Sequence, residues 1–160
     1  MNSNPDQFLE AISRLRDLGW RCVWRQNATS SPSEILERYS WLPDDYLNFT
    51  ASLQECVSPD ETQWILSPSD FDRALDHAFA HDEWERISVE AADGDAATVR
   101  KIRRFWDAHM PIHFDVSTGY SYHAICVGDR TGHVVCGREP VFEDVEPVVG
   151  SFTEFLHQLS

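Results

Sequence analysis

The chain has 160 residues, of which 42% are hydrophobic, and a formal net charge of −14 at pH 7. Six Trp, nine Phe and four Tyr supply the large side chains that a core needs, so the composition excludes disorder and predicts a single domain over residues 1–160. The acidic excess repels polyanions, which argues against nucleic acid as a partner, and it attracts basic proteins.

The first third of the sequence predicts helices with a short strand between them. Asn4, Pro5 and Gln7 match a helix start, apolar residues follow at helical spacing, and Gly19 can end that helix. The segment WRCVWR, residues 20–25, predicts a short strand. Two further helices are then predicted: one over 31–39, opened by a capping box, and one over 43–53, opened by Pro43.

The middle of the sequence predicts one strand and two helices. Residues 63–66 predict the strand, and Ser67, Pro68 and Asp70 predict a helix that runs through Phe79. Residues 90–97 have the composition of a loop, after which a helix is predicted over 99–106.

The last part of the sequence predicts extended segments separated by turns, many of them containing Gly. These segments are 112–115, 121–127, 133–137, 141–143 and 148–149. Ser151 and Glu154 then form a capping box for a last helix with one apolar face. Helices first and antiparallel strands later predict a single α+β domain with a mostly antiparallel sheet in its C-terminal half and a C-terminal helix.

Acidic residues are densest between positions 55 and 95, where twelve acids accompany two bases. Trp84 stands in the charged run HDEWER, and an aromatic side chain among steering charges is typical of a binding hot spot. Burial in the core is the alternative for Trp84, and it is the favoured assignment for Trp64. We expect a basic partner to contact Asp60, Glu61, Asp70, Asp72, Asp76, Asp82, Glu83, Trp84 and Glu85.

The sequence contains no nucleophile elbow, P-loop, dinucleotide-binding or deaminase motif, so neither an enzyme nor a cofactor is expected. His77 and His81 lie four residues apart beside acids and could hold a metal. Without a third ligand at a recognisable spacing, however, surface histidines are favoured and no metal is expected. The N-terminus lacks a signal peptide, and no apolar stretch approaches the ~20 residues of a membrane span, which predicts a cytoplasmic protein that does not enter membranes.

The four cysteines show no CxxC spacing, which disfavours zinc and thioredoxin-like sites and favours buried free thiols. Cys126 and Cys136 could face each other across a hairpin, but a reducing compartment makes a disulfide between them unexpected.

Several segments resemble the SUKH superfamily in order and spacing. These are LPDDYLNF at 42–49, WILS at 64–67, and the run from 110 to 159 that contains MPIHFDVSTGYSYHAICV, GHVVCGREPVFED and VGSFTEFL. The superfamily includes proteins similar to a fungal cell-wall-synthesis regulator and immunity proteins of bacterial polymorphic toxin systems. The resemblance implies an α+β fold with a mixed sheet backed by helices, and a role in binding and blocking a toxin, often a nuclease.

Charge and resemblance together predict an immunity-type protein that neutralises a cognate, basic toxin domain through an acidic surface. The alternative is a regulatory or scaffolding module that binds a partner protein without any toxin. The oligomeric state stays open.

Overall fold

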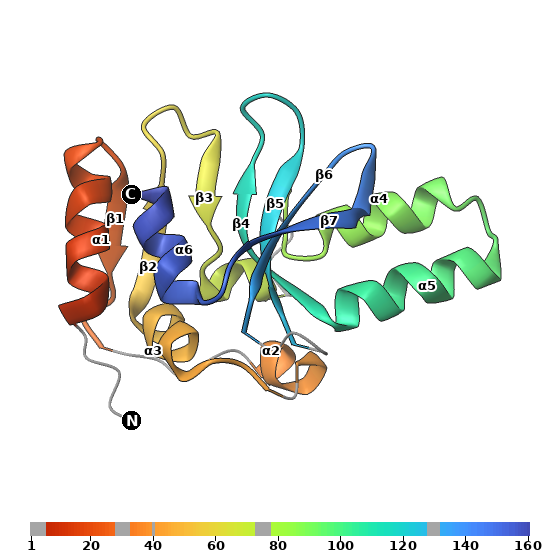
Figure 1. Cartoon of the computed structure of the whole chain (residues 1–160), viewed down its shortest axis with the longest axis horizontal. Helices are drawn as coiled ribbons and strands as arrows, with labels where there is room; N and C mark the ends of the chain where they lie inside the picture. The colour runs from red at the N-terminus through yellow and green to blue at the C-terminus, as the bar shows by residue number, and fades with distance from the viewer. Residues whose placement is uncertain (1–5, 28–32, 40, 73–77, 128–131) are drawn as a thin grey trace.

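The computed structural model describes residues 6–27, 33–39, 41–72, 78–127 and 132–160 and is built on a seven-stranded sheet (Figure 1). The strands follow one another across the sheet in chain order, and each neighbouring pair is antiparallel. The predicted α+β class, with an antiparallel sheet and a C-terminal helix, is confirmed. The sheet also takes in three strands from the first 65 residues.

The elements have the following bounds. They are α1 (Asp6–Asp17), β1 (Arg21–Trp24), α2 (Ser33–Arg38), α3 (Asp44–Ser52), β2 (Leu53–Val57), β3 (Gln63–Ile65), the 3-10 helix η1 (Pro68–Phe71), α4 (Glu83–Ala91), α5 (Ala96–Asp107), β4 (His109–Asp115), β5 (Ser121–Cys126), β6 (Val134–Arg138), β7 (Val141–Val149) and α6 (Phe152–Leu159).

Helices cover both faces of the sheet, with α4 and α5 extending beyond one end of it (Figure 1). On one face, the Trp84 ring of α4 lies 4.9 Å from the Phe114 ring of β4. On the other face, the Phe155 ring of α6 lies 5.7 Å from the His113 ring, next to Phe114 on the same strand. Successive residues of a strand point to opposite faces, so this pair places α4 and α6 on opposite sides of β4. Helices α1 and α3 pack against α6.

The two terminal helices form where the sequence predicts them. In α1, Phe8, Ile12 and Leu15 recur at helical spacing and are buried. At the start of α6, the Ser151 hydroxyl accepts a hydrogen bond from the Glu154 backbone N–H at 3.2 Å, as the capping box requires.

Two elements of the middle region differ from the sequence prediction. Leu53 begins β2 instead of ending α3, because it pairs with Trp24 of the neighbouring strand β1. Of the helix expected over 67–79, the described residues form the 3-10 turn η1, and the backbone at Asp72 is extended. Residues 73–77 lie outside the described part of the chain.

Two further elements differ in the second half. Helix α4 includes most of the charged run HDEWER, for which no element was predicted from the sequence. The alternation of charged and apolar residues in this run is too short and irregular to have indicated a helix. Strand β7 is continuous where two separate pieces were predicted, because it pairs along β6 from Val141 to Val149.

Candidate functional site

The acids expected to contact a partner are spread over three parts of the structure. Asp60 and Glu61 lie in the turn between β2 and β3, Asp70 and Asp72 lie at η1, and Asp82, Glu83 and Glu85 lie at the start of α4. Asp76 is outside the described residues. Figure 1 places the β2–β3 turn at the top of the sheet and α4 at its right-hand end. The acids of the β2–β3 turn therefore lie apart from those of α4, and the described acids do not form one patch.

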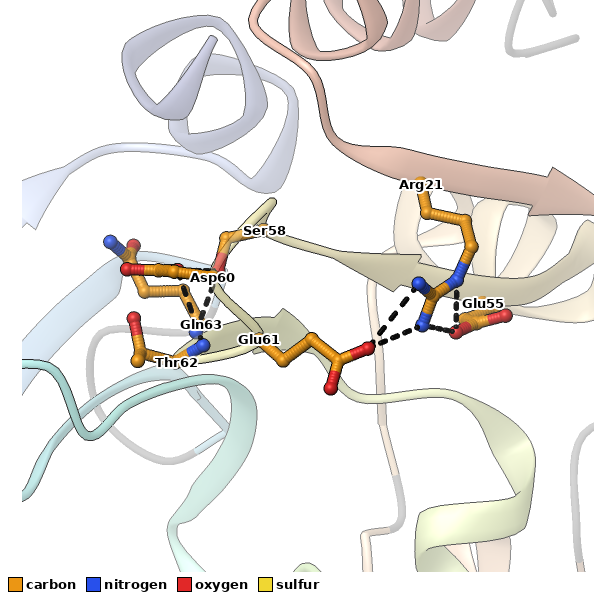
Figure 2. Close-up of polar contacts among 7 residues, drawn as sticks. All are labelled: Arg21, Glu55, Ser58, Asp60, Glu61, Thr62 and Gln63. Atoms are coloured by element: carbon orange, nitrogen blue, oxygen red, sulfur yellow. Dashed lines mark hydrogen bonds and ion pairs between the residues drawn. The ribbon is translucent and has the colours of Figure 1, made fainter.

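The β2–β3 turn is organised around the Asp60 carboxylate (Figure 2). Its Oδ1 accepts hydrogen bonds from the Ser58 hydroxyl at 2.7 Å and from the Thr62 backbone N–H at 3.3 Å. These donated hydrogen bonds lower the pKa of Asp60 below its ordinary value. Asp60 is therefore a structural residue of the turn as well as an exposed charge.

The next acid of the turn, Glu61, points toward an arginine of the neighbouring strand (Figure 2). Arg21 of β1 donates from Nε to Glu55 Oε1 at 2.8 Å and lies 3.4 Å from Glu61 Oε1. The hydrogen bonds and charges of both carboxylates raise the pKa of Arg21. Part of the negative charge at this turn is thus balanced inside the molecule.

Asp70 at η1 also has a structural role. Its Oδ2 accepts hydrogen bonds from the Ser67 backbone N–H at 2.7 Å and from the Ser67 hydroxyl at 3.2 Å. Its backbone oxygen accepts from the backbone N–H of His81 at 3.0 Å. Asp70 therefore connects the turn before η1 to the segment that leads into α4.

The acids of α4 border a groove of about 700 Å³ between α2, α4 and α5, which we call the charged groove. It is lined by Glu37, Arg38, Asp82, Glu85, Arg86, Val89, Arg103 and Asp107. Arg38 donates two hydrogen bonds to the Glu85 carboxylate, at 2.7 and 2.9 Å, and its Nε donates to Asp107 at 3.0 Å. Acids and arginines are interleaved here, so the groove does not present a single sign of charge.

The Arg38–Glu85 pair is shielded from water, with side chains 17% and 14% exposed. Burial acts to lower the pKa of Arg38, but the hydrogen bonds to Glu85 and the nearby negative charges outweigh it and raise the pKa above its ordinary value. Glu85 is consequently held by the protein itself, and a partner could reach it only by breaking this pair.

Replacing Arg38 with alanine is expected to lower the free energy of unfolding by about 2 kcal/mol, because the largely buried Glu85 carboxylate is then left without its partner. Urea denaturation of the two proteins measures the difference. Arg14→Ala is the matched control, since Arg14 pairs with Glu10 on the exposed face of α1 and such pairs contribute about 0.5 kcal/mol or less. Equal losses in the two variants would show that the Arg38–Glu85 pair stabilises the fold no more than the exposed Arg14–Glu10 pair does.

The expectation that Trp84 anchors a partner is wrong for this fold. Its side chain has no exposed surface, and its ring stacks on Phe142 at 5.1 Å and on Tyr120 at 5.0 Å. Of the charged neighbours of Trp84 in HDEWER, Arg86 is exposed and Asp82, Glu83 and Glu85 are partly buried, while the indole is the fully buried side chain of this helix turn. Trp64, assigned to the core, is partly buried and packs against Phe114.

The structure reveals an acidic surface that the sequence analysis missed. Edge strand β7 carries Asp144 and Glu146, both exposed, and Glu139 lies exposed just before it. A fourth acid, Glu143, accepts a hydrogen bond from the Trp106 indole at 2.8 Å. The signal in the sequence was the run from 139 to 149, which contains four acids and no base. We call Asp144 and Glu146 the β7 acids.

Two observations concern metals and membranes. Within the described ranges, no group of three or more His, Cys, Asp or Glu side chains is placed to hold a metal ion. His77 lies outside those ranges, while His81 is buried and stacks on Phe71 at 4.8 Å.

The helices of the described ranges are all too short or too polar to cross a membrane.

Compared with protein-family models, with curated proteins and with solved structures, the chain gives no match.

Proposed function

We propose that this protein is an immunity-type protein that binds and neutralises a cognate bacterial toxin domain in the cytoplasm. The toxin domain is basic, and a nuclease is the class that fits best. The resemblance of residues 110–159 to the SUKH superfamily supports the role, and the net charge of −14 supports the choice of partner.

One structural observation carries the proposal. Among the residues whose side chains the structure describes, no Asp or Glu is buried. The buried polar side chains there are Thr50, Ser58, Ser67, His81 and His113. The described carboxylates therefore lie at or near the surface, where their charge acts on an approaching protein.

Electrostatic attraction explains how such a surface would serve against a nuclease. A nuclease must bind a polyanion and so carries a basic cleft, and an acidic protein surface competes for that cleft. Attraction between opposite charges raises the association rate by 10- to 1000-fold and weakens as salt screens it. Neutralisation then needs only that the bound protein covers the cleft.

The β7 acids are better placed for this contact than the acids of the β2–β3 turn and of α4 that pair with arginines. Asp144 and Glu146 are exposed on an edge strand, whereas Glu61, Glu83 and Glu85 face arginines of the same chain. The negative charge of the second group is therefore partly balanced by arginines of the same chain before a partner arrives.

Co-expression with the product of the adjacent gene, as the candidate toxin, tests the role. We expect the two proteins to purify together, their affinity to fall as salt is raised, and cells to survive expression of the toxin. Cells that remain fully sensitive to the toxin while expressing this protein would contradict the proposal. Capture of a housekeeping protein in place of the toxin would favour the regulatory or scaffolding alternative.

Neutralising the β7 acids tests which surface makes the contact. The double variant Asp144→Asn, Glu146→Gln is expected to weaken toxin binding roughly tenfold, mainly because two charges facing the partner are lost. The matched control, Asp17→Asn with Asp93→Asn, removes two exposed acids elsewhere and is expected to weaken binding less than about twofold. Titration calorimetry at fixed salt measures both. Equal effects would mean that only the overall charge matters, and that β7 is not the contact.

A further inference from the structure

Two cysteines far apart in the sequence lie opposite each other in the sheet. Cys22 of β1 and Cys56 of β2 are paired residues of an antiparallel ladder, and their Sγ atoms are 2.6 Å apart. Directly opposed residues of such a ladder have Cα atoms about 4.5–5.5 Å apart, within the range that disulfides span. Bond formation between these sulfurs therefore needs only a small local movement.

The other two cysteines are not arranged in this way. Cys136 of β6 is paired with His123, and the backbone N–H of Cys126 donates to the oxygen of His133. Cys126 and Cys136 thus lie at different levels of the β5–β6 ladder, and the idea that they face each other across the hairpin is wrong. The structure selects Cys22 and Cys56 instead.

The surroundings of the pair assign different roles to its two sulfurs. A hydrogen bond from the Cys56 thiol lowers the pKa of Cys22, against the opposing effect of burial, and the Arg16 charge acts in the same direction. The same interaction, together with burial, raises the pKa of Cys56. Arg16 is held at this place by its guanidinium, which donates to the Cys22 backbone oxygen at 2.7 and 3.1 Å. Cys22 is therefore the thiol of the pair that loses its proton more readily.

We propose that Cys22 and Cys56 are a reversible oxidation site that forms an intramolecular disulfide with a low-molecular-weight disulfide as the oxidant. The Cys22 thiolate attacks one sulfur of oxidised glutathione, forms a mixed disulfide and releases one glutathione thiolate. Cys56 then loses its proton to solvent and attacks the Cys22 sulfur, releasing the second glutathione. Two protein thiols are oxidised and one glutathione disulfide is reduced to two thiols.

The oxidant can reach the pair because β1 is a four-residue strand at the edge of the sheet. Short edge elements open locally at much lower cost than the whole fold. In a reducing cytoplasm the pair stays as two thiols, and it closes when the ratio of oxidised to reduced glutathione rises. The inference does not depend on the proposed function.

Closure should make the protein more resistant to heat. The bond joins residues separated by 34 positions, so it removes much of the freedom of the unfolded chain between them. We expect the midpoint of thermal unfolding to rise by about 10 °C on oxidation and to return to its starting value after reduction.

Thiol counting after equilibration with oxidised glutathione tests the proposal on the full chain. The chain has four cysteines, so we expect four free thiols in denaturant before treatment and two after it, with mass spectrometry joining the peptides of Cys22 and Cys56. Four thiols remaining in the treated protein, or a bond that maps to another pair, would overturn the proposal.

Matched serine variants complete the test. The Cys126→Ser, Cys136→Ser protein should keep both the bond and the thermal shift, and it should fall from two free thiols to none. Cys22→Ser and Cys56→Ser should each lose the intramolecular bond and the shift. If a single variant is poorly folded by circular dichroism, the Cys126→Ser, Cys136→Ser protein still decides the question, because a failure to close there contradicts the assignment.

Discussion

Replacing Trp84 with alanine is expected to lower the free energy of unfolding by about 4 kcal/mol. The side chain is fully buried and its ring contacts Phe114, Tyr120 and Phe142, so its removal leaves a large cavity among aromatic residues. Urea denaturation followed by far-ultraviolet circular dichroism measures the loss.

Two further variants show whether the loss comes from packing. Trp41 is 47% exposed, so Trp41→Ala is expected to cost less than about 1 kcal/mol. Trp84→Phe keeps an aromatic ring in place and should lose only about half as much as Trp84→Ala, which preserves the test if the alanine variant does not fold. A Trp84→Ala protein that is as stable as the wild type would mean that the indole lies at the surface after all.

Acidification is expected to destabilise the protein through two neighbouring histidines of β4 and β5. The Nδ1 atoms of His113 and His123 lie 3.1 Å apart. Burial lowers the pKa of His113 to about 3, helped by the charge of His123, and burial lowers the pKa of His123 to about 4 against the opposing charge of Asp115. Both rings are therefore neutral in the folded protein at pH 7.

The direction of the pH effect follows from these pKa values. An unfolded histidine has a pKa near 6.5, so below that pH the unfolded chain binds more protons than the folded one. The contribution of the pair to stability is complete above pH 6.5 and is lost as the pH falls from 6.5 toward 3. At pH 5 the two histidines together are expected to lower the free energy of unfolding by about 4 kcal/mol.

Urea denaturation at pH 7 and pH 5 measures this loss. His113→Phe removes one of the two titrating rings, so the difference between the two pH values should shrink by about half. Val135→Ala is the control, since it removes buried apolar atoms on the neighbouring strand without a titrating group and should lower stability equally at both pH values. If His113→Phe keeps the full pH dependence, the loss comes from other groups.

The pairing of carboxylates with distant arginines explains why the candidate site was only partly predictable from the sequence. The excess of Asp and Glu in the sequence predicted a protein with an acidic surface, and the structure places the described carboxylates outside the core. Which of them are free to meet a partner depends on arginines that are distant in sequence, as Arg38 is from Glu85 and Arg21 is from Glu61. Such ion pairs form only when helices and strands have packed together, so no local sequence pattern predicts them.

Sequence by itself determined the elements whose signals are local. The stripe of Phe8, Ile12 and Leu15 specifies α1, and the capping box of Ser151 and Glu154 specifies α6, because each depends on residues within two turns of a helix. The alternating and β-branched segments after residue 110 likewise specify strands.

Only the tertiary structure decided the features that depend on distant residues. Leu53 is a strand residue because it pairs with Trp24, and Cys22 lies opposite Cys56 because of the register of the same two strands. Trp84 is buried because it packs among aromatic residues of the sheet. Hydrogen bonding across a sheet and burial of apolar surface join residues without regard to their separation along the chain. Such contacts have no signature within a short window of sequence, and they decide which side chains remain available at the surface.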